Sequence, residues 1–256
     1  MAKYKGNEIK YLKKILSGQD WSGTSGGVNN ALEKLFSKKL KSKYSVGFNS
    51  GTGTLHAALV AVGVKPGDEV ISPGFSVMFN TTSTIHCNAI PVYADVDLDT
   101  YNIDPKEIEK RITDKTKAIQ IVSIYGLPPE MDEIMEISKK YDIPIIEDNA
   151  ECYLGYYKGK LMGTFGAIAS YSFENSKHIS CGEGGMITTN NKAFATICRK
   201  IGGQGFRVLT ADEGRTKLDP EIWQNPNFER HDVIGYNYRL SEFSAAIALA
   251  QLENLE

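Results

Sequence analysis

Residues 143–150 read Ile143-Pro144-Ile145-Ile146-Glu147-Asp148-Asn149-Ala150, an apolar run that ends on carboxylates. A short continuous apolar run suits a strand that is buried on both faces, as strands of a parallel sheet are. Open α/β sheets bind their ligands at the carboxyl ends of such strands. The stretch therefore predicts a buried parallel strand with Asp148 at the ligand-binding edge. An aspartate in this position also fits a cap of a following helix.

On both sides of this stretch, strand-like runs alternate with helical patterns. Strands are expected at 46–48, 69–72, 89–96, 118–123, 167–173 and 185–189. Helices are expected at 7–16, 28–40, 55–62, 80–87, 104–112, 131–141, 192–201 and from residue 241 onward. Such alternation is typical of parallel strands joined by crossover helices. The sequence thus predicts an α/β fold, a three-layer αβα sandwich with a mostly parallel central sheet. Residues 202–234 are polar and weakly periodic, which indicates a long irregular segment or a lid.

A lysine lies between two of the expected strands, in Tyr171-Ser172-Phe173-Glu174-Asn175-Ser176-Lys177-His178-Ile179-Ser180-Cys181-Gly182-Glu183-Gly184-Gly185. An amine in partly desolvated surroundings loses its proton more easily and can form a Schiff base with an aldehyde. Most loop lysines are simply solvated, so Lys177 needs support from the rest of the chain.

That support comes from a third stretch, Tyr44-Ser45-Val46-Gly47-Phe48-Asn49-Ser50-Gly51-Thr52-Gly53-Thr54, a strand that runs into a small-residue turn and then a helix. Free backbone N–H groups and the dipole at a helix start favour a phosphate. A phosphate site, the carboxylate of Asp148 and the amine of Lys177 are together what pyridoxal phosphate needs.

Composition excludes several other classes of function. The chain of 256 residues carries 29 basic and 31 acidic residues and no long basic run, which argues against nucleic-acid binding. No apolar stretch reaches the roughly 18 residues of a membrane span, and the N-terminus is too polar for a signal peptide, so a cytoplasmic protein is expected. The four cysteines lack C-x-x-C spacing and nearby paired histidines, so no metal site and no disulfide framework is expected.

The chain resembles the fold-type-I pyridoxal-phosphate enzymes, and among them the nucleotide-sugar aminotransferases of the DegT/DnrJ/EryC1/StrS family. The resemblance spans about residues 12–256 and rests on the segments 50–52, 66–71, 91–97, 116–119, 147–150, 172–177, 182–185 and 235–242. It implies the large domain of the aspartate-aminotransferase fold over residues 1–256. Since the family continues into a small carboxyl-terminal domain, the chain is expected to be truncated or partial. The sequence around Lys177 is similar to the corresponding sequence in the branch of the family that includes perosamine synthases.

The resemblance also implies roles for single residues. Lys177 would carry the cofactor and then move a proton, while Asp148 would keep the ring nitrogen protonated. The phosphate would be bound by a group of small polar residues, namely Ser50, Gly51, Thr52 and Ser172. Asn237 matches an asparagine that reaches the phosphate from the neighbouring subunit, which implies a homodimer with shared active sites. Without the resemblance, Ser172 fits a packed strand and Asn237 a turn.

Two positions depart from the family pattern. Glu151 stands where many members have glutamine or histidine beside the cofactor ring. Val77 stands where many have an aromatic residue that stacks on the ring, and Phe75 or Phe79 is an alternative source of that stacking.

The expected activity is transfer of an amino group, from glutamate, to a nucleotide-linked keto-6-deoxy sugar for polysaccharide synthesis. Related sugar dehydratases carry histidine in place of the lysine, so Lys177 favours transamination. Two alternatives stay open. One is another fold-type-I activity, such as a lyase or desulfurase. The other is a non-catalytic fragment that only binds the cofactor or dimerises.

Overall fold

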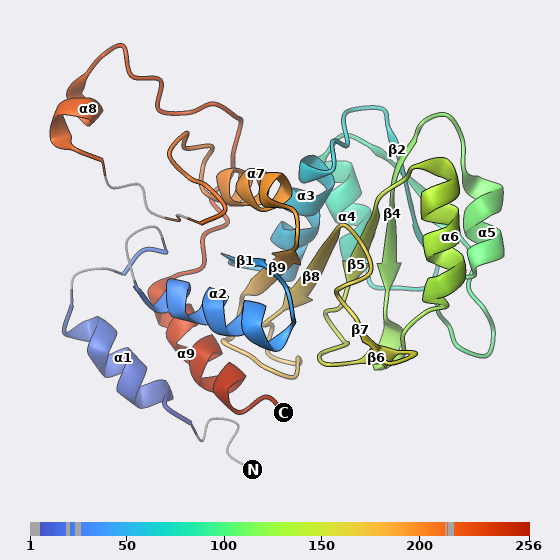
Figure 1. The fold of residues 1–256 in the computed structure, drawn as a ribbon, viewed down its shortest axis with the longest axis horizontal. Coiled ribbons are helices and arrows are strands. Elements are labelled where there is room, and N and C mark those ends of the chain that lie inside the picture. The colour runs from blue at the N-terminus through green and yellow to red at the C-terminus, as the bar shows by residue number, and fades with distance from the viewer. Residues whose placement is uncertain (1–5, 19–20, 24–26, 213, 215–217) are drawn as a thin grey trace.

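A seven-stranded sheet in the order β1-β9-β8-β5-β4-β2-β3 forms the centre of the computed structural model, which describes all residues except 1–5, 19–20, 24–26, 213 and 215–217 (Figure 1). The strands are β1 (Tyr44–Phe48), β2 (Glu69–Pro73), β3 (Ile90–Ala94), β4 (Thr116–Val122), β5 (Ile145–Asp148), β8 (Ile168–Ser172) and β9 (Gly185–Thr189). Strand β9 runs antiparallel to both of its neighbours, β1 and β8, and the other neighbouring pairs in this sheet are parallel. The predicted mostly parallel sheet is confirmed.

Helices cover both faces of the sheet, so the predicted three-layer sandwich is also confirmed (Figure 1). One layer contains α3 (Gly51–Ala61), α4 (Phe79–His86) and α7 (Lys192–Gly202). The other contains α2 (Gly27–Lys39), α5 (Pro105–Arg111), α6 (Met131–Tyr141) and α9 (Glu242–Glu253). Helix α1 (Glu8–Leu16) packs against α9.

The apolar run of β5 is continuous because the two faces of the strand enter different cores. Ile145 packs in the core beneath α5 and α6, and Ile146 packs in the core beneath α3 and α7. Successive side chains of a strand point to opposite faces, so a strand covered by helices on both sides needs apolar residues at consecutive positions. This pattern leaves Asp148 at the carboxyl end of the strand, where the apolar run stops.

Two segments outside the main sheet differ in how well the sequence predicted them. Residues 155–160, where no strand was predicted, contain a small hairpin of β6 (Tyr156–Tyr157) and β7 (Lys160–Leu161). Its turn residues Lys158 and Gly159 both have positive φ, 47° and 80°, which matches the twist of a tight hairpin. Residues 202–234 are largely irregular in their described part, as predicted, and include α8 (Pro220–Gln224), which extends away from the sheet (Figure 1).

The start of β9 connects two strand ends that are far apart in sequence. Gly185 pairs with Phe48 of β1 and with Ser172 of β8. A Cβ atom on Gly185 would lie 2.6 Å from the carbonyl oxygen of Ser50, so only glycine fits this close approach. The start of α3 and the loop that carries Lys177 are therefore held at the same edge of the sheet.

Nothing in the described part of the chain forms a helix long and apolar enough to cross a membrane.

Candidate active site

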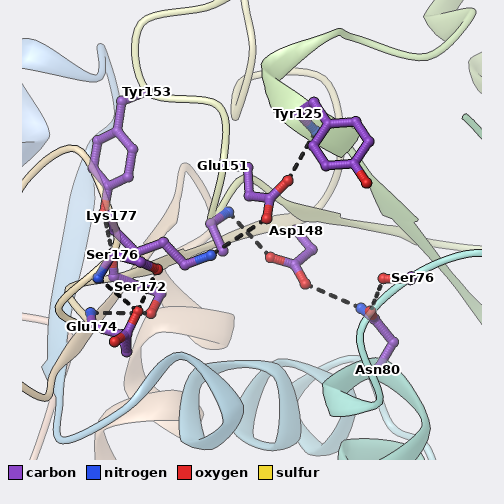
Figure 2. Close-up of polar contacts among 11 residues, drawn as sticks. Ser76, Asn80, Tyr125, Asp148, Glu151, Tyr153, Ser172, Glu174, Ser176 and Lys177 are labelled. Carbon is purple, nitrogen blue, oxygen red and sulfur yellow. Dashed lines mark hydrogen bonds and ion pairs between the residues drawn. The ribbon is translucent and has the colours of Figure 1, made fainter. Parts of the chain in front are cut away.

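Lys177 lies in the loop between β8 and β9, as the sequence predicted. Its backbone N–H donates to the carbonyl of Glu174 at 3.0 Å, which closes a turn at this position. The side chain is four-fifths buried, and its Nζ lies 3.5 Å from Oε1 of Glu151 (Figure 2). The amine is thus directed from one loop toward the segment that follows β5.

Asp148 ends β5 and is only 4% exposed. Its Oδ1 accepts a hydrogen bond from the backbone N–H of Ala150 at 3.1 Å, and its Oδ2 accepts one from Nδ2 of Asn80 at 3.2 Å. Burial raises the pKa of Asp148, and these two hydrogen bonds and the charge of Lys177 oppose part of that rise. A cationic partner at this carboxylate would therefore favour its ionised form.

Glu151 contacts both Lys177 and the segment that follows a third strand, β4. Besides contacting Lys177, it accepts a hydrogen bond at Oε2 from the backbone N–H of Tyr125, at 2.8 Å. Tyr125 follows β4 in the short 3₁₀ turn η1 (Ile124–Gly126) and has a left-handed backbone, with φ of 52°. Figure 2 shows Glu151 between Tyr125 and Lys177, beside Asp148.

The first turn of α3 is the place where the sequence predicts an anion site. Ser50 caps this helix, because its Oγ accepts a hydrogen bond from the N–H of Gly53 at 3.0 Å. The N–H groups of Gly51 and Thr52 belong to the first turn, where a helix offers no acceptor of its own. A Cβ on Gly51 would lie 3.0 Å from Cβ of Ser172, so the turn and the end of β8 are in contact.

Ser172 and Asn237 take different positions relative to this turn. Ser172 is buried beside Gly51, its Oγ accepts from the N–H of Glu174 at 3.3 Å, and its carbonyl accepts from the hydroxyl of Tyr153 at 2.7 Å. Asn237 is exposed, and its carbonyl accepts a hydrogen bond from Nδ2 of Asn49 at 3.3 Å. The structure thus brings Lys177, Glu151, Asp148, Ser172 and the start of α3 together and leaves the side chain of Asn237 at the surface.

Three further residues lie at this site and were not predicted from the sequence, namely Asn80, Tyr125 and Tyr153. Asn80 lies near the start of α4 and is positioned in turn by Ser76, whose Oγ donates to it at 3.1 Å. Asn80 and Tyr125 come shortly after β2 and β4, so the rule that ligands bind at carboxyl ends of strands gave a signal for both.

Phe75, Val77 and Phe79 lie in or next to the segment before α4, and all three are exposed. The ring of Phe75 packs against that of Tyr101, with centroids 5.6 Å apart. The assignment of a ring-stacking residue stays a prediction.

The residues present fit pyridoxal phosphate. The contact between Gly51 and Ser172 leaves the first N–H groups of α3 beside a hydroxyl, as an anion site needs. The nearly buried Asp148 offers a charge for a protonated ring nitrogen, and Lys177 offers the amine. Among the described residues, no group of three or more His, Cys, Asp or Glu is placed to hold a metal ion.

Comparisons with known proteins agree with this fit. The model of the DegT/DnrJ/EryC1/StrS aminotransferase family matches residues 3–256. A GDP-perosamine synthase of Escherichia coli O157:H7 is 38% identical over 98% of this chain and 64% of the relative. Another from Caulobacter vibrioides is 38% identical over 98% of this chain and 63% of the relative. The chain thus spans less than two thirds of the length of these relatives.

Solved structures of aminotransferases and of a related dehydratase also resemble this chain. A GDP-4-keto-6-deoxymannose-3-dehydratase with a trapped PLP-glutamate geminal diamine is 30% identical, with a TM-score of 0.88 over 100% of this chain and 67% of that chain. An aminotransferase of Psychrobacter cryohalolentis is 30% identical, with a TM-score of 0.87 over 98% of this chain and 62% of that chain. The predicted resemblance is confirmed, and the chain belongs to the DegT/DnrJ/EryC1/StrS aminotransferase family.

Proposed function

We propose that residues 1–256 form the cofactor-binding large domain of a pyridoxal-phosphate-dependent aminotransferase, which transfers an amino group from glutamate to a nucleotide-linked keto-6-deoxy sugar. The observation that carries this proposal is the meeting of three groups at one sheet edge. These groups are the amine of Lys177, the buried carboxylate of Asp148 and the first turn of α3. The sugar class is supported by the names of the relatives, two of which are GDP-perosamine synthases.

Each group has a task in this reaction. When bound, pyridoxal phosphate supplies an electron sink for the carbanion that forms at the amino donor. Asp148 holds a proton on the ring nitrogen, because a buried carboxylate is stabilised by a cation beside it. The N–H groups of Gly51 and Thr52 and the hydroxyl of Ser172 bind the phosphate. Lys177 holds the cofactor and then moves a proton to and from the reacting carbon.

Lys177 also supports transamination over dehydration of the same kind of sugar. A dehydratase and an aminotransferase are both among the similar structures, so the fold alone does not separate the two reactions. An amine is needed to release an aminated product and to regain the cofactor, and this chain has that amine. Glu151 lies against it and takes part in holding the cofactor ring.

Reduction with borohydride in the presence of pyridoxal phosphate tests the site. We expect the cofactor to become attached to Lys177 in a peptide identified by mass spectrometry, and Lys177→Ala to lose both attachment and turnover. Lys158→Ala is the matched control, because Lys158 is an exposed lysine paired with Asp132 at the surface. Turnover by Lys177→Ala at the wild-type rate would overturn the assignment.

Conversion of glutamate to 2-oxoglutarate separates this proposal from its alternative. Cofactor attachment without that conversion would instead favour a fragment that binds cofactor but does not catalyse. A screen of nucleotide-linked keto sugars, with glutamate as donor, then identifies the acceptor.

We further propose a homodimer in which Asn237 of one copy binds the phosphate held by the other. The exposed side chain of Asn237 supports this, since it is available to a second copy. Mixing Lys177→Ala with Asn237→Ala protein would give hybrid dimers in which one site carries both substitutions and the other carries none. Activity should recover to roughly a quarter of the wild-type rate, since half of randomly mixed dimers are hybrids with one intact site. No recovery would mean that each site is built from one chain.

A further inference from the structure

A cluster of aromatic rings lies beside the start of α3, outside the groups assigned above. Its centre is His56 of α3, which is 2% exposed. Nδ1 of His56 lies 3.1 Å from the hydroxyl oxygen of Tyr238, within hydrogen-bond distance. The rings of His86 and Tyr236 also face His56, with centroids 5.5 and 4.9 Å away.

The backbone around Tyr238 is fixed on both sides. The N–H groups of Tyr236 and Tyr238 donate to the carbonyls of Ile201 and Gly202 at 2.6 and 2.9 Å. The carbonyl of Tyr238 accepts from the N–H of Asn49 at 2.8 Å. Residues 236–239 therefore run as an extended segment between the end of α7 and the residue before the cap of α3.

Side chains along this segment separate into two sets. The rings of Tyr236 and Tyr238 stack with centroids 5.2 Å apart and planes 5° apart, and both face His56. Because successive residues of an extended chain point to opposite sides, Asn237 is directed away from these rings. Its exposure agrees with that direction.

The same tyrosine also touches the helix start. A Cβ on Gly53 would lie 3.3 Å from Cγ of Tyr238, so the ring packs against the first turn of α3. Burial, and then the charge of His86, lower the pKa of His56 to about 4. His56 is therefore a neutral hydrogen-bond partner at physiological pH.

We propose that His56 is a positioning residue that, through its hydrogen bond to Tyr238, sets the direction in which Asn237 is presented to the phosphate site of the second copy. This inference rests on the shared site proposed above. The hydroxyl of Tyr238 is the contact that distinguishes it from Tyr236, whose ring stacks in the same cluster. Loss of that hydroxyl removes the side-chain hydrogen bond between α3 and this segment, so the direction of Asn237 is set less precisely, although the backbone hydrogen bonds and the stacked rings remain.

Binding of two probes tests this role. Pyridoxal phosphate carries the phosphate that Asn237 would bind, and pyridoxal lacks it, so the ratio of their dissociation constants reports on the phosphate contact alone. We expect Tyr238→Phe to weaken binding of pyridoxal phosphate roughly fivefold and to leave binding of pyridoxal unchanged. Tyr236→Phe is the matched control, because it removes a hydroxyl from the other stacked ring, and it should leave both constants unchanged.

A double variant makes the test independent of general stability. If Tyr238 acts through Asn237, Tyr238→Phe combined with Asn237→Ala should bind pyridoxal phosphate no more weakly than Asn237→Ala alone. His56→Asn, which keeps a polar group near the position of Nδ1, should bind pyridoxal phosphate more tightly than His56→Leu. All proteins are compared at concentrations where sedimentation shows the same oligomer.

Four results would overturn the inference. Equal weakening of both probes by Tyr238→Phe would show a general structural role. So would losses that add in the double variant. Wild-type affinity for pyridoxal phosphate in Tyr238→Phe, with weakened binding in Asn237→Ala, would remove this inference alone. Unchanged binding in Asn237→Ala would remove the shared site and this inference with it.

Discussion

Glu147 and Asp148 are consecutive acids of β5, both buried, yet they serve two different regions of the molecule. Glu147 faces the loop after the β6–β7 hairpin, where its oxygens accept hydrogen bonds from the N–H groups of Gly163, Phe165 and Gly166 at 2.6, 2.8 and 2.6 Å. Asp148 faces the opposite side of the sheet, toward α4 and Lys177, and has one backbone and one side-chain donor. Burial raises the pKa of both carboxyl groups.

The difference shows that burial alone does not mark a functional acid. The three donors of Glu147 belong to the backbone and cannot rotate away, so this carboxylate ties β5 to a loop. One of the donors to Asp148 is the amide of Asn80, which can turn over, and the lysine lies on the same side. An acid held partly by adjustable donors beside an amine is suited to a ligand that brings its own charge.

The largest effect expected from the difference between Asp148 and Glu147 is on the rate of turnover. Asp148→Asn should lower turnover roughly 10²- to 10³-fold, because an uncharged amide does not stabilise the protonated ring nitrogen. Pyridoxal phosphate should still be trapped on Lys177 by borohydride. The measurement is the steady-state rate of 2-oxoglutarate formation at saturating substrates.

Glu147→Gln is the control for that experiment, since it changes the neighbouring acid in the same way. Its rate per folded molecule should stay within a few-fold of wild type. A drop equal to that of Asp148→Asn would mean that any change at the end of β5 disturbs catalysis, and the distinction between the two acids would be lost. An unchanged rate in Asp148→Asn would remove Asp148 from its assigned role.

The elements of this fold were predictable because their patterns are local. Helix α6 was expected at its observed limits, and its apolar positions repeat with the helical period. The run that forms β5 was equally clear, because helices on both faces require apolar residues throughout. The β6–β7 hairpin was missed, because strands of two residues show no period and Lys158-Gly159 is not one of the usual turn pairs.

The site was predictable only in its separate parts. Lys177 and Asp148 follow from strand ends and from the family resemblance, and the structure brings both to one edge. The contacts of Glu151 with Lys177 and Tyr125, and of Asn80 with Asp148, depend on the order of the strands in the sheet. Sequence spacing does not give strand order, so these contacts needed the structure. The orientation of Asn237 relative to His56 also needed the structure, because sequence spacing does not give it.

A second, smaller effect concerns stability. Glu147→Gln should lower the free energy of unfolding by about 1–3 kcal/mol, because the new amide nitrogen faces a fixed N–H donor and leaves it unsatisfied. Urea unfolding at neutral pH, followed by circular dichroism, measures this loss. Stability equal to that of the wild type would mean that the loop adjusts to the amide, and that Glu147 is no more fixed than Asp148.

The smallest expected effect is also on stability, but it is a gain and not a loss. In protein without cofactor, Asp148→Asn should raise the melting temperature at neutral pH by about 2 °C. The raised pKa means that the folded state holds the Asp148 proton more tightly than the unfolded state, whose value is near 3.8. Stability that this group contributes is present below that value and is lost as the pH rises through the folded pKa. The gain from the amide should therefore grow as the pH rises from about 4 toward 7. Asn80 can turn its amide to match the new side chain, whereas the backbone donors around Glu147 cannot turn. Replacement of Asp148 by asparagine therefore removes the cost of a buried charge without leaving a donor unsatisfied, and replacement of Glu147 by glutamine does not. A destabilised Asp148→Asn, or a gain that does not change with pH, would show that the carboxylate is as well compensated as that of Glu147.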